Sequence, residues 1–462
     1  MAADEFGQLL ARAADYIADY RRAAADALVY PASDLDVLRS AIGGPVPEAS
    51  SPPSDVIDQL ISGMGPAVVA SAGPRYFGFV TGGALDAPTV ADMLVVGWDQ
   101  LAFNYLSSPP SAIVEEIAGG WLKDLLGLPQ GASFGFVTGA QAANTVCLAA
   151  ARHHVLAAVG WNVEDAGLVG APPIRVVVNG ERHATVDRSL RLLGLGASAV
   201  EAVTTDANGA IEVEALASML SAGPAGPTIV CLQAGNVNTG ACDDLAAAIT
   251  VAYDHGAWVH VDGAFGLWAA ASPTTRHLVE GLERADSWGT DGHKWLNVPY
   301  DAGYAFCAHP DAHAAAMAYT AAYLVGREPA TSRSPGDYVP ESSRRARGVA
   351  TWAAIRQLGR SGIAELVDRC CALARRFASR LASFPGVEVG NDVVLNQVLV
   401  RFGDDDEETD RVVEAVQGSG ECWMGSTTWH GRRYMRISVS SWRTTDHDVD
   451  RAVDAIVAAS RS

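Results

Sequence analysis

Short apolar runs rich in β-branched residues, separated by helical stretches, constrain the fold of this chain most strongly. Three of them cover residues 174–178, 228–232 and 258–261, and residues such as Gly, Pro, Asn and Asp flank them. Runs of this length that are apolar throughout are typical of strands buried on both faces. Because helical segments lie between them, the sequence predicts βαβ units and a mostly parallel sheet. The expected fold class is therefore α/β.

The stretches on either side of this region predict two further parts. Residues 3–27 carry apolar side chains at helical spacing, and a Pro-, Ser- and Gly-rich stretch at 43–54 separates them from a second short helix. We expect an N-terminal helical arm over residues 1–70 that packs on a partner copy. The large α/β domain then covers residues 71–340, and a small α+β domain covers 341–462.

The C-terminal part combines helical and strand-like patterns. Helices are expected from about residue 347 to 358 and from 363 to 384, and strand-like runs follow at 393–402 and 433–440. The acidic run at 404–408 lies between a strand and a helix. Acidic side chains stabilise a helix N-terminus, so we expect this run to cap the helix that follows it.

The overall composition narrows the class of protein. The chain of 462 residues carries 33 basic and 53 acidic side chains, and this net charge of −20 argues against a nucleic-acid-binding protein. The N-terminus lacks the pattern of a signal peptide, and the longest uncharged stretch, residues 215–242, contains too many Gly, Pro and Asn residues for a membrane helix. Seven scattered cysteines without a Cys-x-x-Cys pair indicate neither a disulfide framework nor a zinc site. We expect a cytoplasmic protein without membrane contact.

Lysine is almost absent from this chain, although basic residues are common. Of the 33 basic side chains 31 are arginine, and the two lysines are Lys123 and Lys294. A lysine, unlike an arginine, can lose its proton and act as a nucleophile. Lys123 stands beside Asp124 in a helical pattern and is expected on a helix surface. Lys294 follows a strand-like run and neighbours His293 and Trp295, a setting that would desolvate the amine and lower its pKa; the alternative is a surface lysine.

A lysine nucleophile on an α/β scaffold points to pyridoxal phosphate, which makes further demands on the protein. Its ring nitrogen needs an anion, and Asp262 follows the 258–261 run at the carboxyl end of a strand, where ligands bind in open α/β sheets. Its phosphate needs backbone amides, and residues 137–144 turn from an apolar run into an Ala-rich helix. His183, after the Val-rich run, is a candidate to lie over the ring. Each feature has a structural alternative: an Asx turn, an ordinary helix start and a structural histidine.

Three rival motifs are rejected. Residues 131–135 match the G-x-S-x-G nucleophile pattern, but Phe134 and Phe136 continue an extended pattern where that motif requires a turn into a helix. Neither lysine has the neighbours of a nucleotide-binding P-loop. His309 and His313 share one helix face without a third ligand, so we expect two surface histidines and no metal site.

Five motifs follow one another along the chain. They are Thr138-Gly139-Ala140-Gln141-Ala142-Ala143-Asn144, His183, residues 234–241, His260-Val261-Asp262-Gly263-Ala264 and His293-Lys294-Trp295-Leu296. In this order they resemble the group II pyridoxal-phosphate decarboxylases, which include the aromatic-amino-acid and glutamate decarboxylases. The likeness begins near Pro74, extends past Arg347 and covers most of the chain. It implies the fold type I of pyridoxal-phosphate enzymes, with a mostly parallel, seven-stranded large domain. It also implies a homodimer with a shared active site and an N-terminal arm wrapped over the partner.

The resemblance also implies roles for individual residues. Lys294 would bind pyridoxal 5′-phosphate covalently, Asp262 would pair with the ring nitrogen, and His183 would stack on the ring. Gln141 departs from the small hydroxyl residue usual at its position, and Asn236 stands where Thr is common. The further cofactor contacts that the resemblance implies are Gly139, Ala140, Gln141, Asn236, Ala264 and His293.

The family's mobile catalytic loop carries the residue that separates two reactions. Residues from about 318 to 340 have the composition of such a lid, and Tyr323, 29 residues after Lys294, looks like the family's catalytic tyrosine. A Tyr there protonates the carbanion left after carbon dioxide departs, whereas relatives with Phe are oxidative aldehyde synthases. Tyr323 therefore implies plain decarboxylation, and Tyr319 and Tyr338 are the alternative proton donors.

The resemblance finally implies a substrate class and a reaction. Phe79, Thr81, Trp98 and Tyr105 match side-chain pocket positions, and their character favours an aromatic or bulky aliphatic L-amino acid over an acidic one. The expected reaction is decarboxylation of this small molecule to the amine and carbon dioxide. The alternatives are an oxidative deaminase or aldehyde synthase, an aminotransferase, and a catalytically silent cofactor-binding protein.

Overall fold

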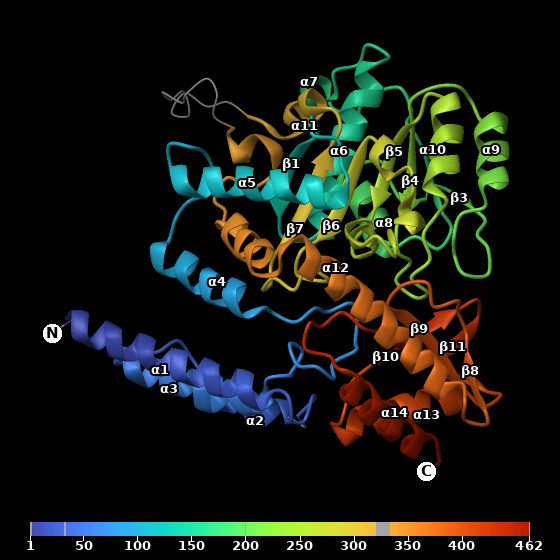
Figure 1. Cartoon of the computed structure of the whole chain (residues 1–462). Coiled ribbons are helices and arrows are strands. Elements are labelled where there is room, and N and C mark those ends of the chain that lie inside the picture. Colours follow the sequence, from blue (N-terminus) through green and yellow to red (C-terminus); the bar gives the residue numbers. More distant parts are fainter. Residues whose placement is uncertain (1, 32–33, 199, 320–332, 462) are drawn as a thin grey trace. The chain divides into compact units, whose positions relative to one another are not determined.

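A computed structural model describes residues 2–31, 34–198, 200–319 and 333–461 (Figure 1). The chain forms two compact units. The smaller unit combines Met1–Thr81, Arg376–Gly390 and Leu399–Ser462, and the larger unit combines Gly82–Arg375 and Asn391–Val398. The division into an arm, a large domain and a C-terminal domain stays a prediction.

A sheet of seven strands forms the centre of the larger unit and confirms the expected α/β class with a mostly parallel sheet (Figure 1). The order is β1-β7-β6-β5-β4-β2-β3. Strands β2 to β6 pair in parallel, whereas β7 runs antiparallel to both of its neighbours. The strands are β1 (Ser133–Val137), β2 (Arg175–Asn179), β3 (Val200–Val203), β4 (Thr228–Gln233), β5 (Trp258–Asp262), β6 (Ser287–Asp291) and β7 (Gly303–Cys307).

Helices of the larger unit cover this sheet. Helix α6 packs against β5, β6 and β7, α10 packs against β4 and β5, and α5 packs against β1. The helices are α4 (Asp86–Trp98), α5 (Pro109–Leu126), α6 (Ala140–Ala157), α7 (Val163–Ala166), α8 (Ala184–Leu192), α9 (Val213–Ala222), α10 (Leu245–Asp254) and α11 (Pro310–Met317). Every residue of β4 and β5 is buried, which explains why these runs are mostly apolar.

Polar residues end the central strands. Asn179, Gln233, Asp262 and Asp291 are the last residues of β2, β4, β5 and β6. Because these strands are parallel, their carboxyl ends meet at one edge of the sheet. The sheet thus gathers carboxylate and amide side chains at the edge where an α/β protein binds its ligands.

The helix α12 (Arg347–Leu381) contains the break that the sequence predicts between two helices. Gly359 has φ 64° and ψ 176°, so the backbone there is not helical. A positive φ is a conformation that glycine adopts without steric cost. The two segments therefore run on either side of Gly359, close to the expected gap after residue 358.

The smaller unit contains the N-terminal helices α1 (Ala2–Ala23), α2 (Leu35–Ile42) and α3 (Pro53–Met64). Helix α2 was not expected from the sequence. Buried Arg75 holds the chain after α1, because its guanidinium donates to the carbonyl oxygens of Ala25 and Ala27 and forms an ion pair with Glu421 at 3.1 Å.

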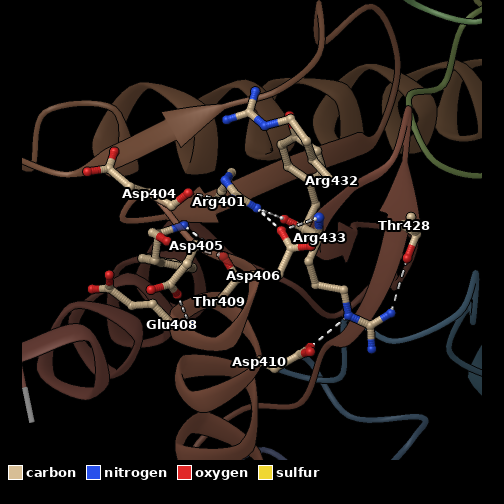
Figure 2. A network of polar contacts seen from close by, with 12 residues as sticks. Arg401, Asp404, Asp405, Asp406, Glu408, Thr409, Asp410, Thr428, Arg432 and Arg433 are labelled. Atoms are coloured by element: carbon tan, nitrogen blue, oxygen red, sulfur yellow. Dashed lines mark hydrogen bonds and ion pairs between the residues drawn. The ribbon is translucent and has the colours of Figure 1, made fainter.

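A second sheet has the order β10-β11-β9-β8 and is accompanied by two helices. Asp405 caps α13 by accepting a hydrogen bond from the Glu408 amide at 2.8 Å, so the expected acidic cap is confirmed. Arg401 pairs with Asp406, and Arg433 donates to Asp410 at 2.7 Å (Figure 2). The elements are β8 (Val387–Val389), β9 (Gln397–Phe402), α13 (Asp406–Ser419), β10 (Gly425–Trp429), β11 (Arg432–Ser438) and α14 (Asp446–Arg461).

Lys123 is not the surface residue that its sequence pattern predicts. Its side chain is buried beneath the start of β1, and its Nζ donates hydrogen bonds to the carbonyl oxygens of Gln130 and Ala132, the latter at 2.9 Å. Burial, and then the charge of Arg333, lowers the pKa of this amine. Lys123 therefore has a structural role at the end of α5.

The expectation of two surface histidines is wrong for His313. His313 is fully buried on α11, with its Nδ1 2.8 Å from the hydroxyl of Ser133, and burial lowers its pKa to about 3. Ser133 begins strand β1, so the structure has no turn into a helix at the rejected nucleophile motif. His309 pairs with Asp286 at 2.7 Å. Within the described ranges, no group of three potential ligands is arranged to hold a metal ion.

A buried ion cluster anchors α5 to the segment before α12. Glu115, 1% exposed, pairs with Arg344 at 2.9 Å and with Arg333 at 3.4 Å. We expect Glu115→Gln to lower the free energy of unfolding by about 3 kcal/mol or more, because it leaves buried guanidinium groups without their counter-charge. Urea denaturation measures this, with Glu116→Gln, on the exposed face of the same helix, as the control. Equal stability of the two variants would contradict the anchoring role.

Across the described residues, no helix is both long and apolar enough to cross a membrane.

Candidate active site

Lys294 lies in the turn that follows β6, with its side chain 21% exposed. Its neighbours Trp295 and Leu296 are buried and fix the turn in the core. A side chain on Gly82 would place its Cβ 1.9 Å from the Lys294 carbonyl oxygen, so only glycine lets the two segments approach this closely. The backbone of Lys294 is therefore packed closely against the segment at Gly82, while its side chain stays partly exposed.

Asp262 lies next to this amine at the end of β5. Its side chain is buried, and Oδ1 accepts a hydrogen bond from the Ala264 amide at 3.2 Å. Burial raises the pKa of this carboxyl, whereas the charges of His183 and Lys294 act in the opposite direction. A buried carboxylate that faces cationic groups is suited to hold a protonated ring nitrogen.

His183 caps the N-terminus of α8 beyond the carboxyl end of β2. Its Nδ1 lies 2.8 Å from the Thr185 hydroxyl and accepts a hydrogen bond from the Thr185 amide at 3.3 Å. The imidazole is exposed and close enough to Asp262 to act on its charge. The structure thus brings together Lys294, Asp262 and His183, three residues that are far apart in the sequence.

The N-terminus of α6 faces the same edge and offers an anion site. Gly139, the N-cap residue, has no side chain to cap the helix, and the first amide of α6, that of Ala140, donates to Asp291 Oδ1. A Cβ on Gly303 would lie 2.4 Å from the Gly139 backbone, so the pair of glycines lets α6 begin directly against β7. The first amides of a helix bind phosphate groups. A nucleophilic lysine, a buried carboxylate and these amides together fit pyridoxal phosphate.

The described chain also matches known proteins. Residues 39–402 match the family model described as the pyridoxal-dependent decarboxylase conserved domain. This chain belongs to the pyridoxal-dependent decarboxylase family. It is a decarboxylase of L-amino acids with pyridoxal phosphate as its cofactor, as the resemblance of its motifs implied.

Its relatives carry out two kinds of reaction. An aromatic-L-amino-acid decarboxylase of Bacillus atrophaeus is 26% identical over 97% of this chain and 94% of its own length. A phenylacetaldehyde synthase of Arabidopsis thaliana is 25% identical over the same shares. The crystal structure of Oryza sativa TDC with PLP and tryptamine superimposes with a TM-score of 0.92 at 24% identity, over 99% of this chain and 98% of that one, which confirms the fold.

Two of the predicted cofactor positions, Gln141 and Asn236, have side chains that form hydrogen bonds with other parts of the protein. The Gln141 amide donates to Ser189 Oγ at 2.9 Å and to the Thr185 carbonyl at 3.3 Å, so it joins α6 to α8. Asn236 is fully buried; it donates to the Glu181 carbonyl at 3.0 Å and accepts from the Asn238 amide at 2.8 Å. These departures from the family pattern therefore shape the loops around the site.

His293 and Tyr300 form an aromatic pair beside Lys294. Their ring centroids are 4.4 Å apart, and His293 Nδ1 accepts a hydrogen bond from the Ala302 amide at 3.1 Å. Burial lowers the pKa of His293, so its ring is neutral near neutral pH. Tyr300 was not predicted as a site residue, although it lies only six residues after Lys294 in the same loop.

The four substrate positions fall in different parts of the molecule. Phe79 and Thr81 belong to the smaller unit, where the Phe79 ring is 63% exposed and stacks on Trp423 at 5.6 Å. Trp98 and Tyr105 belong to the larger unit, where Trp98 lines an apolar cavity of about 510 Å³ between α4, α5 and α12. Their joint role in substrate binding stays a prediction.

The proposed proton donor Tyr323 lies outside the described residues. The alternative donor Tyr319 has its hydroxyl 2.6 Å from Ser342 Oγ. The ring of the other alternative, Tyr338, lies under the guanidinium of Arg333 at 4.6 Å and against His313. Both of these tyrosines thus have structural partners.

Asp243 connects strands that end at the candidate site, a role that was not predicted from the sequence. Its buried carboxylate accepts hydrogen bonds from the side chain of Asn179 at 2.8 Å and from the Gln233 amide at 2.7 Å. It also accepts from the Ile211 amide at 2.8 Å. Asn179 and Gln233 are the last residues of β2 and β4. Asp243 therefore joins the carboxyl ends of these two strands.

The stability of the decarboxylase is expected to depend on the titration of Asp243. Burial raises its pKa from 3.8 to about 6. Since the folded pKa is the higher one, its contribution to stability is present below about pH 4 and is lost as the pH rises through about 6. We expect Asp243→Asn to remove roughly 3 kcal/mol of pH dependence between pH 4 and 7. Urea unfolding across this range measures the pH dependence. Asp254→Asn, at an exposed position of α10, should keep the pH dependence of the natural chain.

Proposed function

We propose that this decarboxylase converts an aromatic L-amino acid to its amine and carbon dioxide at the site around Lys294. The observation that carries the proposal is the cluster of Lys294, Asp262 and His183 beside the start of α6, whose N-cap residue is a glycine. The aromatic-amino-acid decarboxylase among the relatives supports an aromatic substrate.

Each residue has one task in this proposal. Lys294 holds the cofactor covalently, the first amides of α6 bind its phosphate, and Asp262 keeps the ring nitrogen protonated. The bound cofactor supplies an electron sink for the pair left when carbon dioxide departs. His183 covers the ring, and Tyr323 returns a proton to Cα. The site must exclude water while the Cα carries negative charge.

A panel of L-amino acids tests this function. The purified protein with added pyridoxal phosphate is incubated in air with each amino acid, and products are identified by mass spectrometry. The proposal expects an amine that lacks the carboxyl group from at least one aromatic amino acid. Amine formation only from acidic or small amino acids would reject the aromatic assignment.

The second candidate is oxidative formation of an aldehyde. It is favoured by the similarity to a phenylacetaldehyde synthase, which is as close in identity as the decarboxylases. Tyr323 argues for plain decarboxylation, because the family resemblance implies Phe at that position in the relatives that form aldehydes. Oxygen consumption in the same assay, with aldehyde and no amine, would select this second reaction.

We also propose a homodimer with a shared active site. Helix α4 exposes apolar side chains to solvent, among them Val90 and Val96, and Val96 is 64% exposed. An exposed apolar face is typical of a protein–protein interface. We expect sedimentation velocity to show a dimer that Val96→Glu shifts toward monomer, since a buried unpaired charge destabilises an interface. Val159→Glu, at another exposed valine, is the control. A natural chain that sediments as a monomer would reject the dimer.

The cytoplasmic location stays a prediction, which cell fractionation can test.

A further inference from the structure

The side chain of Asp291 joins the two groups that the decarboxylase uses to hold its cofactor. Its Oδ2 lies 2.9 Å from Lys294 Nζ, and its Oδ1 accepts a hydrogen bond of 2.5 Å from the Ala140 amide, the first of α6. The side chain is 3% exposed. The main chain of Asp291 is fixed as well, because its carbonyl accepts from Trp268 Nε1 at 3.0 Å and its amide donates to the Ala264 carbonyl.

Both partners of Asp291 have another use in the enzyme. The Ala140 amide belongs to the helix N-terminus that fits the cofactor's phosphate. The Lys294 amine forms a bond to the aldehyde carbon of the cofactor, a step in which the ammonium gives up protons and one water leaves. Asp291 therefore contacts the same amide as the phosphate and the same amine as the aldehyde.

Two further neighbours of Asp291 carry no charge that offsets its own. His293 Nε2 lies 3.4 Å from Oδ1, but burial lowers the pKa of this histidine and keeps it neutral. Tyr304, on β7, is also close enough to interact with this charge, and burial raises the pKa of its hydroxyl well above the ordinary value, so it is neutral too. A phosphate at the start of α6 then meets a buried carboxylate of the same sign.

We propose that Asp291 is a positioning residue that holds the Lys294 amine and opposes the phosphate of the cofactor, so that it sets the affinity for pyridoxal phosphate. Two like charges about 4 Å apart repel by about 1 kcal/mol in water and by several times more near a protein surface. This repulsion makes the cofactor easier to lose. The activity of the enzyme then follows the supply of pyridoxal phosphate around it.

The test compares two forms of the cofactor in two forms of the protein. Asp291→Asn removes the charge but keeps an oxygen that accepts from Ala140, and pyridoxal differs from pyridoxal phosphate only in the missing phosphate. Absorbance titrations without substrate give the four dissociation constants. We expect the variant to bind pyridoxal phosphate about tenfold more tightly and pyridoxal within about threefold of the natural chain. Asp254→Asn, at an exposed position of α10, should change neither the dissociation constant for pyridoxal phosphate nor that for pyridoxal.

Two outcomes would overturn the proposal. Equal tightening for both cofactor forms would mean that Asp291 acts through the Lys294 amine alone. Unchanged or weaker binding of pyridoxal phosphate would mean that Asp291 supports the phosphate. If the Asn variant does not fold, Asp291→Ser, which also removes the charge, allows the same comparison. No substrate is turned over, so a failure of the aromatic assignment leaves this result unaffected.

Discussion

Replacing Lys294 with alanine is expected to lower the rate of decarboxylation at least about a thousandfold, a loss of roughly 4 kcal/mol in transition-state stabilisation. In the proposed mechanism the amine of Lys294 is the nucleophile that holds the cofactor. The other lysine, Lys123, is buried with its ammonium bound to two carbonyl oxygens. Amine release from the best substrate of the panel, measured with excess pyridoxal phosphate, gives the size of the loss.

Two matched variants show whether this loss comes from the nucleophile. Lys294→Arg keeps a positive charge beside Asp291 but does not form the covalent bond, so it should be as inactive as the alanine variant. Lys123→Arg should retain activity per folded molecule. More than a tenth of the activity in Lys294→Arg would mean that charge, not covalent attachment, is what the site requires of this residue.

Replacing Asp262 with asparagine is expected to lower the rate about 10²- to 10³-fold, or roughly 3–4 kcal/mol. The carboxylate is buried at the end of β5, and in the proposed mechanism its negative charge keeps the ring nitrogen protonated. The neutral amide has nearly the same shape, so the fold should be retained. Single-turnover measurements with saturating cofactor give the chemical rate without the effect of weaker cofactor binding.

Rescue separates this electrostatic role from a structural one. A cofactor analogue methylated on the ring nitrogen carries a permanent positive charge, so it should restore part of the rate in Asp262→Asn. Asp165→Asn, at an exposed acid on α7, should behave as the natural chain with both cofactors. No restoration by the analogue would show that Asp262 serves the fold of the site and not the ring nitrogen.

The sequence predicted the central sheet and the main cofactor cluster for the same physical reason. Strands buried on both faces are apolar throughout, so β4 and β5 were visible as runs. Their carboxyl ends meet at one edge, where Asp262 ends β5, and His183 and Lys294 each follow a strand by a few residues. A motif at a strand end can thus be placed in space before its neighbours are known.

The features that the sequence did not reveal depend on contacts between distant segments. Asp291 meets Ala140 across 151 residues, and Asp243 joins strands that no local pattern connects. Lys123 and His313 are polar residues in helices, yet both are buried and form hydrogen bonds with residues at the start of β1 or just before it. Burial of a polar residue is decided by what packs on its helix, and periodicity alone contains no information about that.

The burial of Lys123 also determines how this protein responds to lysine-directed reagents. Active esters and aldehydes modify amines that solvent reaches, and of the two lysine side chains only Lys294 is partly open. Apart from the label on the terminal amine, each chain would therefore take up one label, and the number of labels would count active sites. The rate of labelling would fall when the cofactor occupies Lys294. Immobilising the enzyme through its lysines would inactivate it, so coupling for sensors or supports needs carboxyl or engineered thiol chemistry instead.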